Sequence, residues 1–142
     1  IIFEPGRFII GNAGILVSKV QYIKKGLNKS FIILDAGMND FMRPALYDSF
    51  HDIIPIVKTN KKNKGSVEFV GPVCETTCKF VKYKNYQKLK ENNYIAISNT
   101  GAYGFSLSSN YNMRPLVAEI FVNKNKHKVI RKRQNLFKLI RV

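Results

Sequence analysis

Cysteine, tryptophan and acidic residues are all scarce in this sequence. Its 142 residues include two cysteines, no tryptophan, and nine Asp and Glu against 24 Lys and Arg. Two cysteines are too few for a scaffold held together by disulfides. Apolar runs such as residues 31–34 fall well short of the about 18 residues that a membrane-spanning helix needs, and the start shows no signal-peptide pattern. The composition of the chain, with 45% hydrophobic and 23% charged residues, is typical of one globular domain.

The net charge of +15 would suit a polyanionic partner such as nucleic acid. However, 18 of the 24 basic residues are lysines, whereas a surface that reads phosphates favours arginine for its bidentate contacts. The lysine clusters at 24–25, 58–64, 82–90 and 124–128 coincide with expected loops. The pattern therefore favours solvated faces, and a basic nucleic-acid-binding β domain is kept as the remoter alternative.

Short segments of alternating apolar residues predict a mostly β domain with antiparallel pairing, as a sandwich or a barrel. We expect strands over 15–22, 31–35, 53–57, 66–70 and 94–98, and a hairpin formed by 116–122 and 128–131 with its turn at 123–126. Pro55 would make its strand an edge or bulged one. Helices are expected over 40–50, with Asp40 as a cap and Pro44 in the first turn, and over 134–140.

Several segments do not fit a strand pattern and hold chemically useful side chains. Arg43 and Tyr47 are four residues apart, so a helix would present them on one face. Cys74 is followed by Glu75, and a thiol beside a carboxylate can serve as a proton donor. Two glycines flank Tyr103 and expose a ring that could stack on a planar cofactor. Each feature also has an ordinary explanation: a surface pair, a buried inert cysteine or a plain turn.

A zinc site is not indicated by the cysteines. Cys74 and Cys78 are four residues apart rather than three, and no second cysteine pair follows. The only histidines that could complete a ligand set are His51 and His127. We therefore predict no metal.

Taken together and in order, the motifs of this chain resemble those of the diaminopimelate decarboxylases. The matching segments are Glu4-Pro-Gly-Arg7, Asp35-Ala-Gly-Met-Asn-Asp40, Arg43-Pro-Ala-Leu-Tyr47, Gly71-Pro-Val-Cys-Glu75, Gly101-Ala-Tyr-Gly104, and Ser109-Asn-Tyr-Asn112 with Arg114-Pro115. The resemblance runs from residue 4 to about residue 133. Members are pyridoxal-phosphate enzymes with an N-terminal α/β barrel of eight strands and a C-terminal β domain.

The resemblance implies how this chain is organised. Residues 1–12, which begin with the strand-like Ile1-Ile2-Phe3, would be the end of the last barrel strand and its phosphate loop. Residues 13–142 would be the C-terminal β domain. The barrel is expected to be missing, together with the lysine that carries the cofactor, because none of the 18 lysines lies in the family's lysine motif.

The resemblance also implies which residues form the active site. The expected cofactor-binding residues are Glu4, Pro5, Gly6, Arg7 and Tyr103. The expected substrate-binding residues are Arg7, Arg43, Tyr47, Glu75 and Tyr103. Arg7 and Arg43 would hold the distal carboxylate of the substrate, with Tyr47 as their hydroxyl partner, and Glu75 would pair with the distal amino group. Cys74 would be the catalytic proton donor at the α-carbon.

The function implied is decarboxylation of meso-2,6-diaminopimelate to L-lysine and CO₂ with pyridoxal 5'-phosphate. The enzyme would be a cytoplasmic homodimer in which Cys74 and Glu75 reach into the neighbouring subunit's site, and the chain alone would be inactive. A related decarboxylase of a polyamine precursor is the nearer alternative, although that branch usually carries Asp where this chain has Glu75. The chain also departs from the family pattern at Cys78, where members commonly have an acidic residue.

Overall fold

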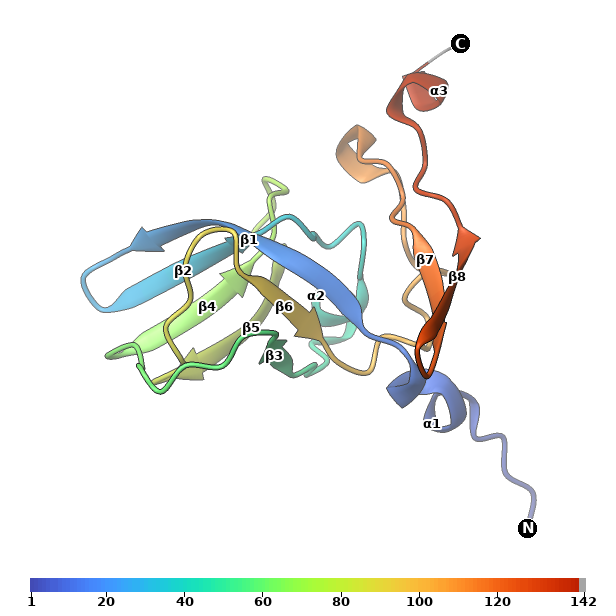
Figure 1. Ribbon diagram of the computed structural model, residues 1–142, viewed down its shortest axis with the longest axis horizontal. Coiled ribbons are helices and arrows are strands. Elements are labelled where there is room, and N and C mark those ends of the chain that lie inside the picture. The colour runs from blue at the N-terminus through green and yellow to red at the C-terminus, as the bar shows by residue number, and fades with distance from the viewer. Residues whose placement is uncertain (141–142) are drawn as a thin grey trace.

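The fold is built on a six-stranded sheet that curls into a half-barrel (Figure 1). The computed structural model describes residues 1–140, so the last two residues of the expected β domain, 141–142, lie outside the described residues. The sheet strands are β1 (Leu16–Lys25), β2 (Lys29–Leu34), β3 (Ile53–Pro55), β4 (Ser66–Val70), β5 (Lys79–Lys84) and β6 (Tyr94–Ile97). A separate hairpin contains β7 (Glu119–Asn123) and β8 (Lys126–Arg131). The short helices are α1 (Gly6–Ile10), η1 (Gly11–Ala13), α2 (Arg43–Tyr47), η2 (Tyr111–Met113) and α3 (Leu136–Ile140). The mostly β prediction is confirmed.

The strand order in the sheet is β3-β6-β1-β2-β4-β5. The antiparallel pairing of β1 with β2 confirms the prediction for these two segments, with a register shift between Val20 and Tyr22. The other strand pairs are antiparallel as predicted, whereas the pairing of β2 with β4 is parallel. Parallel neighbours need a long connection, and the chain between Leu34 and Ser66 supplies one through α2 and β3.

Strand β5 was not predicted, because its lysines were assigned to a loop. From Val81 onward its residues alternate: Val81 and Tyr83 pack against the core, whereas Lys82 and Lys84 are exposed. A register shift opposite the start of the strand places Phe80 in the core as well. β5 lies at one end of the strand order, and charged residues on the solvent face of an edge strand discourage pairing with other chains. Part of the basic cluster at 82–90 therefore belongs to a strand.

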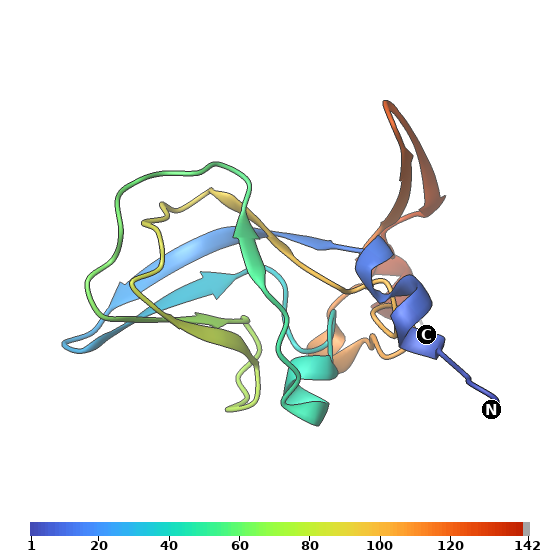
Figure 2. The same cartoon turned by 90° about the horizontal axis from the view of Figure 1, so that it is seen from below.

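Figure 2 shows the curl of the sheet from below. Two tyrosines connect its opposite edges, where β5 and β3 lie. The hydroxyl of Tyr83 accepts a hydrogen bond from the backbone N–H of Ile53 at 2.8 Å, and the hydroxyl of Tyr86 donates to the carbonyl of Ile53 at 2.7 Å. Burial raises the pKa of both tyrosines well above its usual value. These contacts satisfy backbone groups of edge strand β3 that no strand pairs with. Pro55 lies in this edge strand, as predicted.

The hydrophobic core fills the inside of this curled sheet. Its fully buried side chains come from every region of the sheet and from the segment before α2, and include Val20, Ile32, Leu34, Phe41, Ile53, Val67, Phe69, Ile95 and Ile97. The edge-on contact between the rings of Phe41 and His51, with centroids 4.6 Å apart, brings a histidine into this core. The core thus fixes the positions at which β2 and β6 end.

Helix α2 is shorter than the helix expected over 40–50. It begins after Met42, contains Pro44 in its first turn as predicted, and ends at Asp48, whose φ of 51° is left-handed. Asp40 is not its cap: the Asp40 carboxylate accepts the backbone N–H of Gly37 at 2.8 Å and so closes a tight turn before the helix. At the other end of the chain, α3 falls within the predicted 134–140 and is capped by the Asn135 side chain, which accepts the N–H of Phe137 at 2.8 Å.

The expected strand at Ile1-Ile2-Phe3 is absent. Residues 1–5 have no regular structure, and the three apolar side chains are 79–110% exposed. A strand requires a hydrogen-bonded neighbour, and none lies beside this segment among residues 1–140. The Pro5-Gly6-Arg7 sequence starts helix α1, with Pro5 at the N-cap position.

The motif at 35–40 anchors the segment that leads to β7. Arg114 donates to the side chain of Asn39 at 3.0 Å and to the backbone carbonyl of Asp35, and lies 3.7 Å from the carboxylate of Asp40. Burial raises the pKa of Asp40, an effect opposed by the Gly37 N–H and the Arg114 charge. The forked guanidinium thus connects two motifs that are far apart in the sequence.

Replacing Arg114 is expected to destabilise the protein. Arg114→Met keeps most of the side-chain length but leaves the Asn39 side-chain oxygen and the Asp35 carbonyl without their donor, and the Asp40 carboxylate without its nearby positive charge. A lost hydrogen bond to a charged group costs about 1.5–3 kcal/mol, so the free energy of unfolding should fall by about that amount in urea titrations. Arg131→Met is the control: it removes an exposed ion pair with Glu119 and a cation–π contact with the ring of Phe105, and should cost about 1 kcal/mol. Equal losses in both variants would contradict the anchoring role.

The chain exposes much apolar surface. Its accessible area is 10466 Å², whereas a compact monomer of this mass exposes about 7,500 Å². The excess lies partly on the β7–β8 hairpin, which stands apart from the sheet (Figure 1) and exposes Ile120, Phe121, Val122, Val129 and Ile130. Patches of this extent mark interaction surfaces. None of the helices among residues 1–140 has the length and apolar character to cross a bilayer.

Candidate active site

The first half of the candidate site rests on close backbone packing between the N-terminal segment and the turn after β6. The N–H groups of Thr100 and Gly101 donate to the carbonyls of Gly14 and Gly11 at 2.9 and 3.0 Å. A Cβ atom on Gly101 would lie 2.2 Å from the carbonyl oxygen of Ile10, so only glycine fits there. This packing places helix α1 against the Gly101–Gly104 turn and therefore beside Tyr103.

Arg43 lies between two tyrosine rings. Its guanidinium carbon is 5.3 Å from the ring centroid of Tyr47 and 5.7 Å from that of Tyr103, within the range of a cation–π interaction. The contact with Tyr47 confirms that the i, i+4 spacing puts both residues on one helical face. Tyr103 has a φ of 60°, a left-handed conformation unfavourable for a tyrosine. Such strain concentrates at functional sites.

Helix α1 completes this group. A Cβ on Gly6 would lie 3.4 Å from the hydroxyl of Tyr103, an ordinary contact distance, so the start of α1 lies directly beside the tyrosine. Arg7 follows on the same helix. Neither Arg7 nor Arg43 forms an ion pair within residues 1–140. We call Arg7, Arg43, Tyr47 and Tyr103 the arginine cluster; two guanidinium groups beside phenol hydroxyls are well suited to binding a carboxylate.

His51 lies buried behind the arginine cluster and was not predicted as a site residue. It is 1% exposed, and its Nδ1 atom is 2.9 Å from the carbonyl oxygen of Ser98. Burial lowers the pKa of His51, and the positive charges of Arg43 and Arg7 lower it further. The hydrogen bond to Ser98 acts in the opposite direction and raises the pKa. Both arginines therefore lie within electrostatic reach of one neutral imidazole. No local motif marks this histidine in the sequence.

Cys74 and Glu75 form a second group, on the β4–β5 connection. Cys74 is exposed, and both residues line a cavity of about 600 Å³ that also contains Cys78. The Glu75 carboxylate accepts a hydrogen bond from the hydroxyl of Tyr111, which raises the pKa of Tyr111. Tyr111 belongs to one of the matching motifs, but no local pattern predicts its contact with Glu75.

Cys78 is a packed residue rather than a reactive one. It is 3% exposed, its sulfur accepts the backbone N–H of Met38 at 3.4 Å, and a Cβ on Gly71 would lie 2.5 Å from that sulfur. Cys74 and Cys78 form no disulfide. Within the described part of the chain, no group of three His, Cys, Asp or Glu side chains is arranged to bind a metal ion.

The predicted site residues thus fall into two groups. The hydrogen bonds, ion pairs and cation–π contacts of residues 1–140 do not connect the arginine cluster with Cys74 or Glu75. Glu4 and Pro5 lie next to the cluster at the start of α1, where the carbonyls of both accept backbone N–H groups. Within one copy of the chain, the two groups are therefore not joined by any of these contacts.

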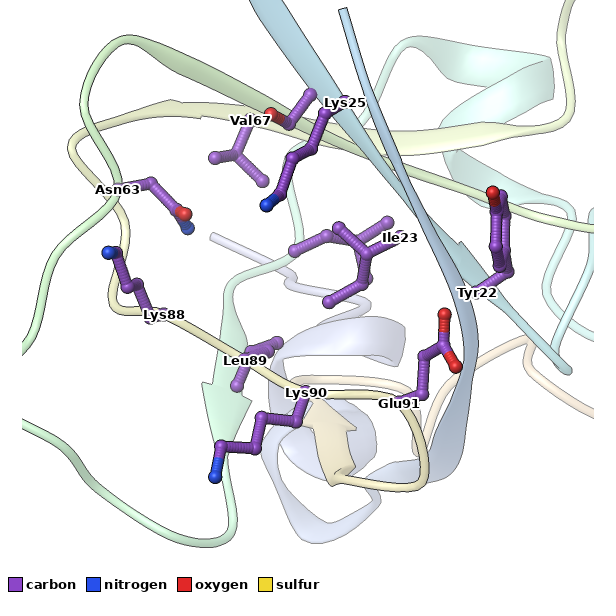
Figure 3. A pocket seen from close by; sticks show the side chains of 11 residues that line it. Tyr22, Ile23, Lys25, Asn63, Val67, Lys88, Leu89, Lys90 and Glu91 are labelled. Atoms are coloured by element: carbon purple, nitrogen blue, oxygen red, sulfur yellow. The ribbon is translucent and has the colours of Figure 1, made fainter.

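A further cavity, of about 670 Å³, lies elsewhere in the molecule (Figure 3). It is lined by apolar side chains such as Ile23, Val67 and Leu89 and by the lysines Lys25, Lys88 and Lys90. None of the predicted site residues lines it. The candidate chemistry therefore belongs to the arginine cluster and the Cys74–Glu75 group rather than to this cavity.

Comparison with known proteins identifies the class of this domain. Residues 7–101 match the C-terminal sheet domain of the pyridoxal-dependent decarboxylases, and the chain belongs to that family. Within it, the chain is similar to diaminopimelate decarboxylases: it is 48% identical to the enzyme of Aquifex aeolicus over 135 residues and 47% identical to that of Vibrio cholerae over 139 residues.

Solved structures show the same similarity. The crystal structure of diaminopimelate decarboxylase from Helicobacter pylori complexed with L-lysine superimposes with a TM-score of 0.85 at 43% identity, covering 96% of this chain and 33% of that one. The Aquifex and Vibrio alignments cover 95% and 98% of this chain but only 32% and 33% of those proteins. The chain thus spans about a third of the length of the relatives that it matches.

Proposed function

We propose that this chain is the C-terminal part of an enzyme that decarboxylates meso-2,6-diaminopimelate to L-lysine and CO₂ in the cytoplasm, joined to an α/β barrel that carries the cofactor. The observation that supports this best is the arginine cluster. It presents Arg43 between two tyrosines, near Arg7, with neither guanidinium neutralised by a side chain among residues 1–140. This arrangement occurs in a domain whose family is pyridoxal-dependent.

The residues around Tyr103 fit pyridoxal phosphate. The start of α1 at Gly6 lies beside the Tyr103 hydroxyl, and Arg7 supplies positive charge suited to a phosphate. Glu4, Pro5, Gly6 and Arg7 would hold the phosphate end, and Tyr103 would contact the ring. When bound, the cofactor accepts the electron pair left by departing CO₂. The residues of this chain orient the substrate and supply a proton.

Substrate selection follows from the charges of the two groups. Diaminopimelate has an amino acid group at each end, so the end that does not react offers a carboxylate and an ammonium. Arg7 and Arg43 would bind that carboxylate, with the Tyr47 hydroxyl as a further donor. Glu75 would pair with the ammonium. Ornithine and arginine have no distal carboxylate and would leave the arginines unpaired.

Cys74 would donate the proton to the α-carbon after CO₂ departs, through its exposed thiol. Because Cys74 lacks contact with the arginine cluster of its own chain, we propose that it serves the site of a second subunit in a homodimer. The excess of about 3,000 Å² of exposed surface over a compact monomer supports burial against a barrel and a partner. It exceeds the about 800 Å² that one side of a standard interface buries.

The test compares this chain alone with the same chain joined to its barrel. With pyridoxal phosphate, the joined protein is expected to release CO₂ from meso-diaminopimelate and to prefer it over ornithine and arginine in kcat/KM. The 142-residue chain alone is expected to release none. A preference for ornithine or arginine would instead indicate a decarboxylase of a polyamine precursor, and CO₂ release by the chain alone would contradict the need for a barrel.

A further inference from the structure

His51 is a buried polar side chain with half of its hydrogen-bonding capacity unused. The carbonyl of Ser98 can only accept, so the Nδ1 atom at 2.9 Å must carry the proton. The imidazole is neutral because burial and two arginine charges lower its pKa. Its Nε2 atom is therefore a hydrogen-bond acceptor. That atom is buried and has no partner within the described residues.

Arg43 has the complementary unused group. Its Nε atom is buried and likewise has no hydrogen-bond partner in residues 1–140, although guanidinium Nε–H is always a donor. Arg43 and His51 lie beside the same turn: the Arg43 guanidinium carbon is 5.7 Å from the ring centroid of Tyr103, and His51 packs on Phe41, which adjoins the next residue of that turn, Gly104. Buried polar groups are nearly always paired in native structures. An unpaired acceptor beside an unpaired donor points to a contact that forms in another state of the site.

The surroundings of His51 show why a contact there would matter. Its ring packs edge-on against Phe41, and Phe41 lies 3.9 Å from where a Cβ on Gly104 would be. His51 therefore lies where three elements meet. Phe41 links it to the turn that carries Tyr103, Ser98 links it to the end of β6, and Arg43 belongs to α2. A rigid imidazole held at this junction can fix the direction of a long and otherwise rotatable arginine side chain.

We propose that His51 is a positioning residue for the substrate carboxylate: its Nε2 atom accepts a hydrogen bond from the Nε–H of Arg43 when substrate is bound. This inference rests on the proposed function of the arginine cluster. The bond uses the one donor on the inner side of the guanidinium. It directs the two terminal NH₂ groups toward the carboxylate, where they can bind both oxygens. His51 itself does not touch the substrate.

Two isosteric variants of the intact enzyme separate this role from simple packing. Asn places its side-chain amide where His has Nδ1, so His51→Asn keeps a donor for Ser98 but loses the Nε2 acceptor. Gln places its amide oxygen near Nε2, so His51→Gln keeps the acceptor for Arg43 but loses the donor to Ser98. We expect His51→Asn to raise KM for diaminopimelate about tenfold with kcat little changed, and His51→Gln to retain a KM near the wild-type value.

L-lysine binding provides a readout that does not depend on turnover. L-lysine keeps the distal carboxylate, whereas cadaverine has none, so calorimetry should show weaker L-lysine binding in His51→Asn and unchanged cadaverine binding. In an Arg43→Ala background, His51→Asn should cause no further loss. His127→Asn, on the exposed face of β8, is the matched control and should behave as wild type.

Several results would overturn the inference. If His51→Gln raised KM while His51→Asn did not, only the hydrogen bond to Ser98 would matter. If His51→Asn and Arg43→Ala weakened L-lysine binding additively, His51 and Arg43 would act independently. If the variants do not fold, a crystal structure of the wild-type enzyme with L-lysine decides: Nε2 and Nε should lie about 2.7–3.2 Å apart, and a separation that excludes a hydrogen bond would refute the inference. A wild-type enzyme inactive on diaminopimelate would instead refute the proposed function.

Discussion

Replacing Cys74 with alanine in the intact enzyme is expected to lower kcat for diaminopimelate about 10²- to 10⁴-fold, the usual contribution of a positioned proton donor. Binding of pyridoxal phosphate should stay near the wild-type level, because Cys74 lies outside the group of residues around Tyr103. KM should also change little, since the arginine cluster is intact. Steady-state kinetics together with a titration of cofactor binding would measure all three quantities.

Cys78→Ala is the matched control, because it removes the same atom four residues further along the loop. Cys78 is buried against Gly71 and the backbone of Met38, so its loss should reduce the melting temperature and leave kcat nearly unchanged. Cys74 is exposed, so Cys74→Ala should show the reverse. If Cys74→Ala retained full turnover, or if Cys78→Ala lost as much, the thiol of Cys74 would not be the proton donor.

A mixed dimer would test the shared site. Subunits carrying Cys74→Ala and subunits carrying Arg43→Ala each lack a different part of the proposed site. If Cys74 serves the neighbouring subunit, a heterodimer of the two variants contains one complete site and should recover up to half of the wild-type activity. The assay uses diaminopimelate well below the raised KM of Arg43→Ala, where both variants turn over slowly. If each chain builds its own site, mixing the two impaired variants restores nothing.

Local sequence patterns predicted the elements whose signals are local. The alternation of Ser66–Val70 and of Tyr94–Ile97 marks strands because side chains in a strand alternate between its faces, and both strands are present. The spacing of Arg43 and Tyr47 fixed their shared helical face in the same way. The local pattern did not predict the lysine-rich strand β5, because its exposed face carries charged residues that are equally common in loops.

Features that depend on the folded sheet were not predictable from such patterns. The parallel pairing of β2 with β4 is decided by how the connection between them packs, and no residue in either strand encodes it. The same holds for His51 and Tyr111. Each forms its hydrogen bond with a partner more than 35 residues away, Ser98 for His51 and Glu75 for Tyr111, so nothing in the nearby sequence distinguishes them.

Arg43→Ala is expected to produce the largest change in substrate affinity. The variant removes one of the two guanidinium groups proposed to hold the distal carboxylate, and a lost hydrogen bond to a charged group costs about 1.5–3 kcal/mol. KM for diaminopimelate should therefore rise about 10- to 150-fold. Arg43→Lys keeps the charge but not the planar fork, and should fall between wild type and Arg43→Ala.

The same variant should also change the choice of substrate, and this separates a binding role from a structural one. Without Arg43, diaminopimelate loses a contact that L-lysine analogues lacking the carboxylate never had. The ratio of the affinity for diaminopimelate to the affinity for cadaverine-like ligands should therefore fall by the factor by which KM rises. The affinity for the cadaverine-like ligands themselves should stay constant. Because Arg43 packs between Tyr47 and Tyr103, a purely structural loss would weaken both classes of ligand alike. Measuring both classes on Arg43→Ala thus decides whether this guanidinium recognises the carboxylate or only holds the tyrosines apart.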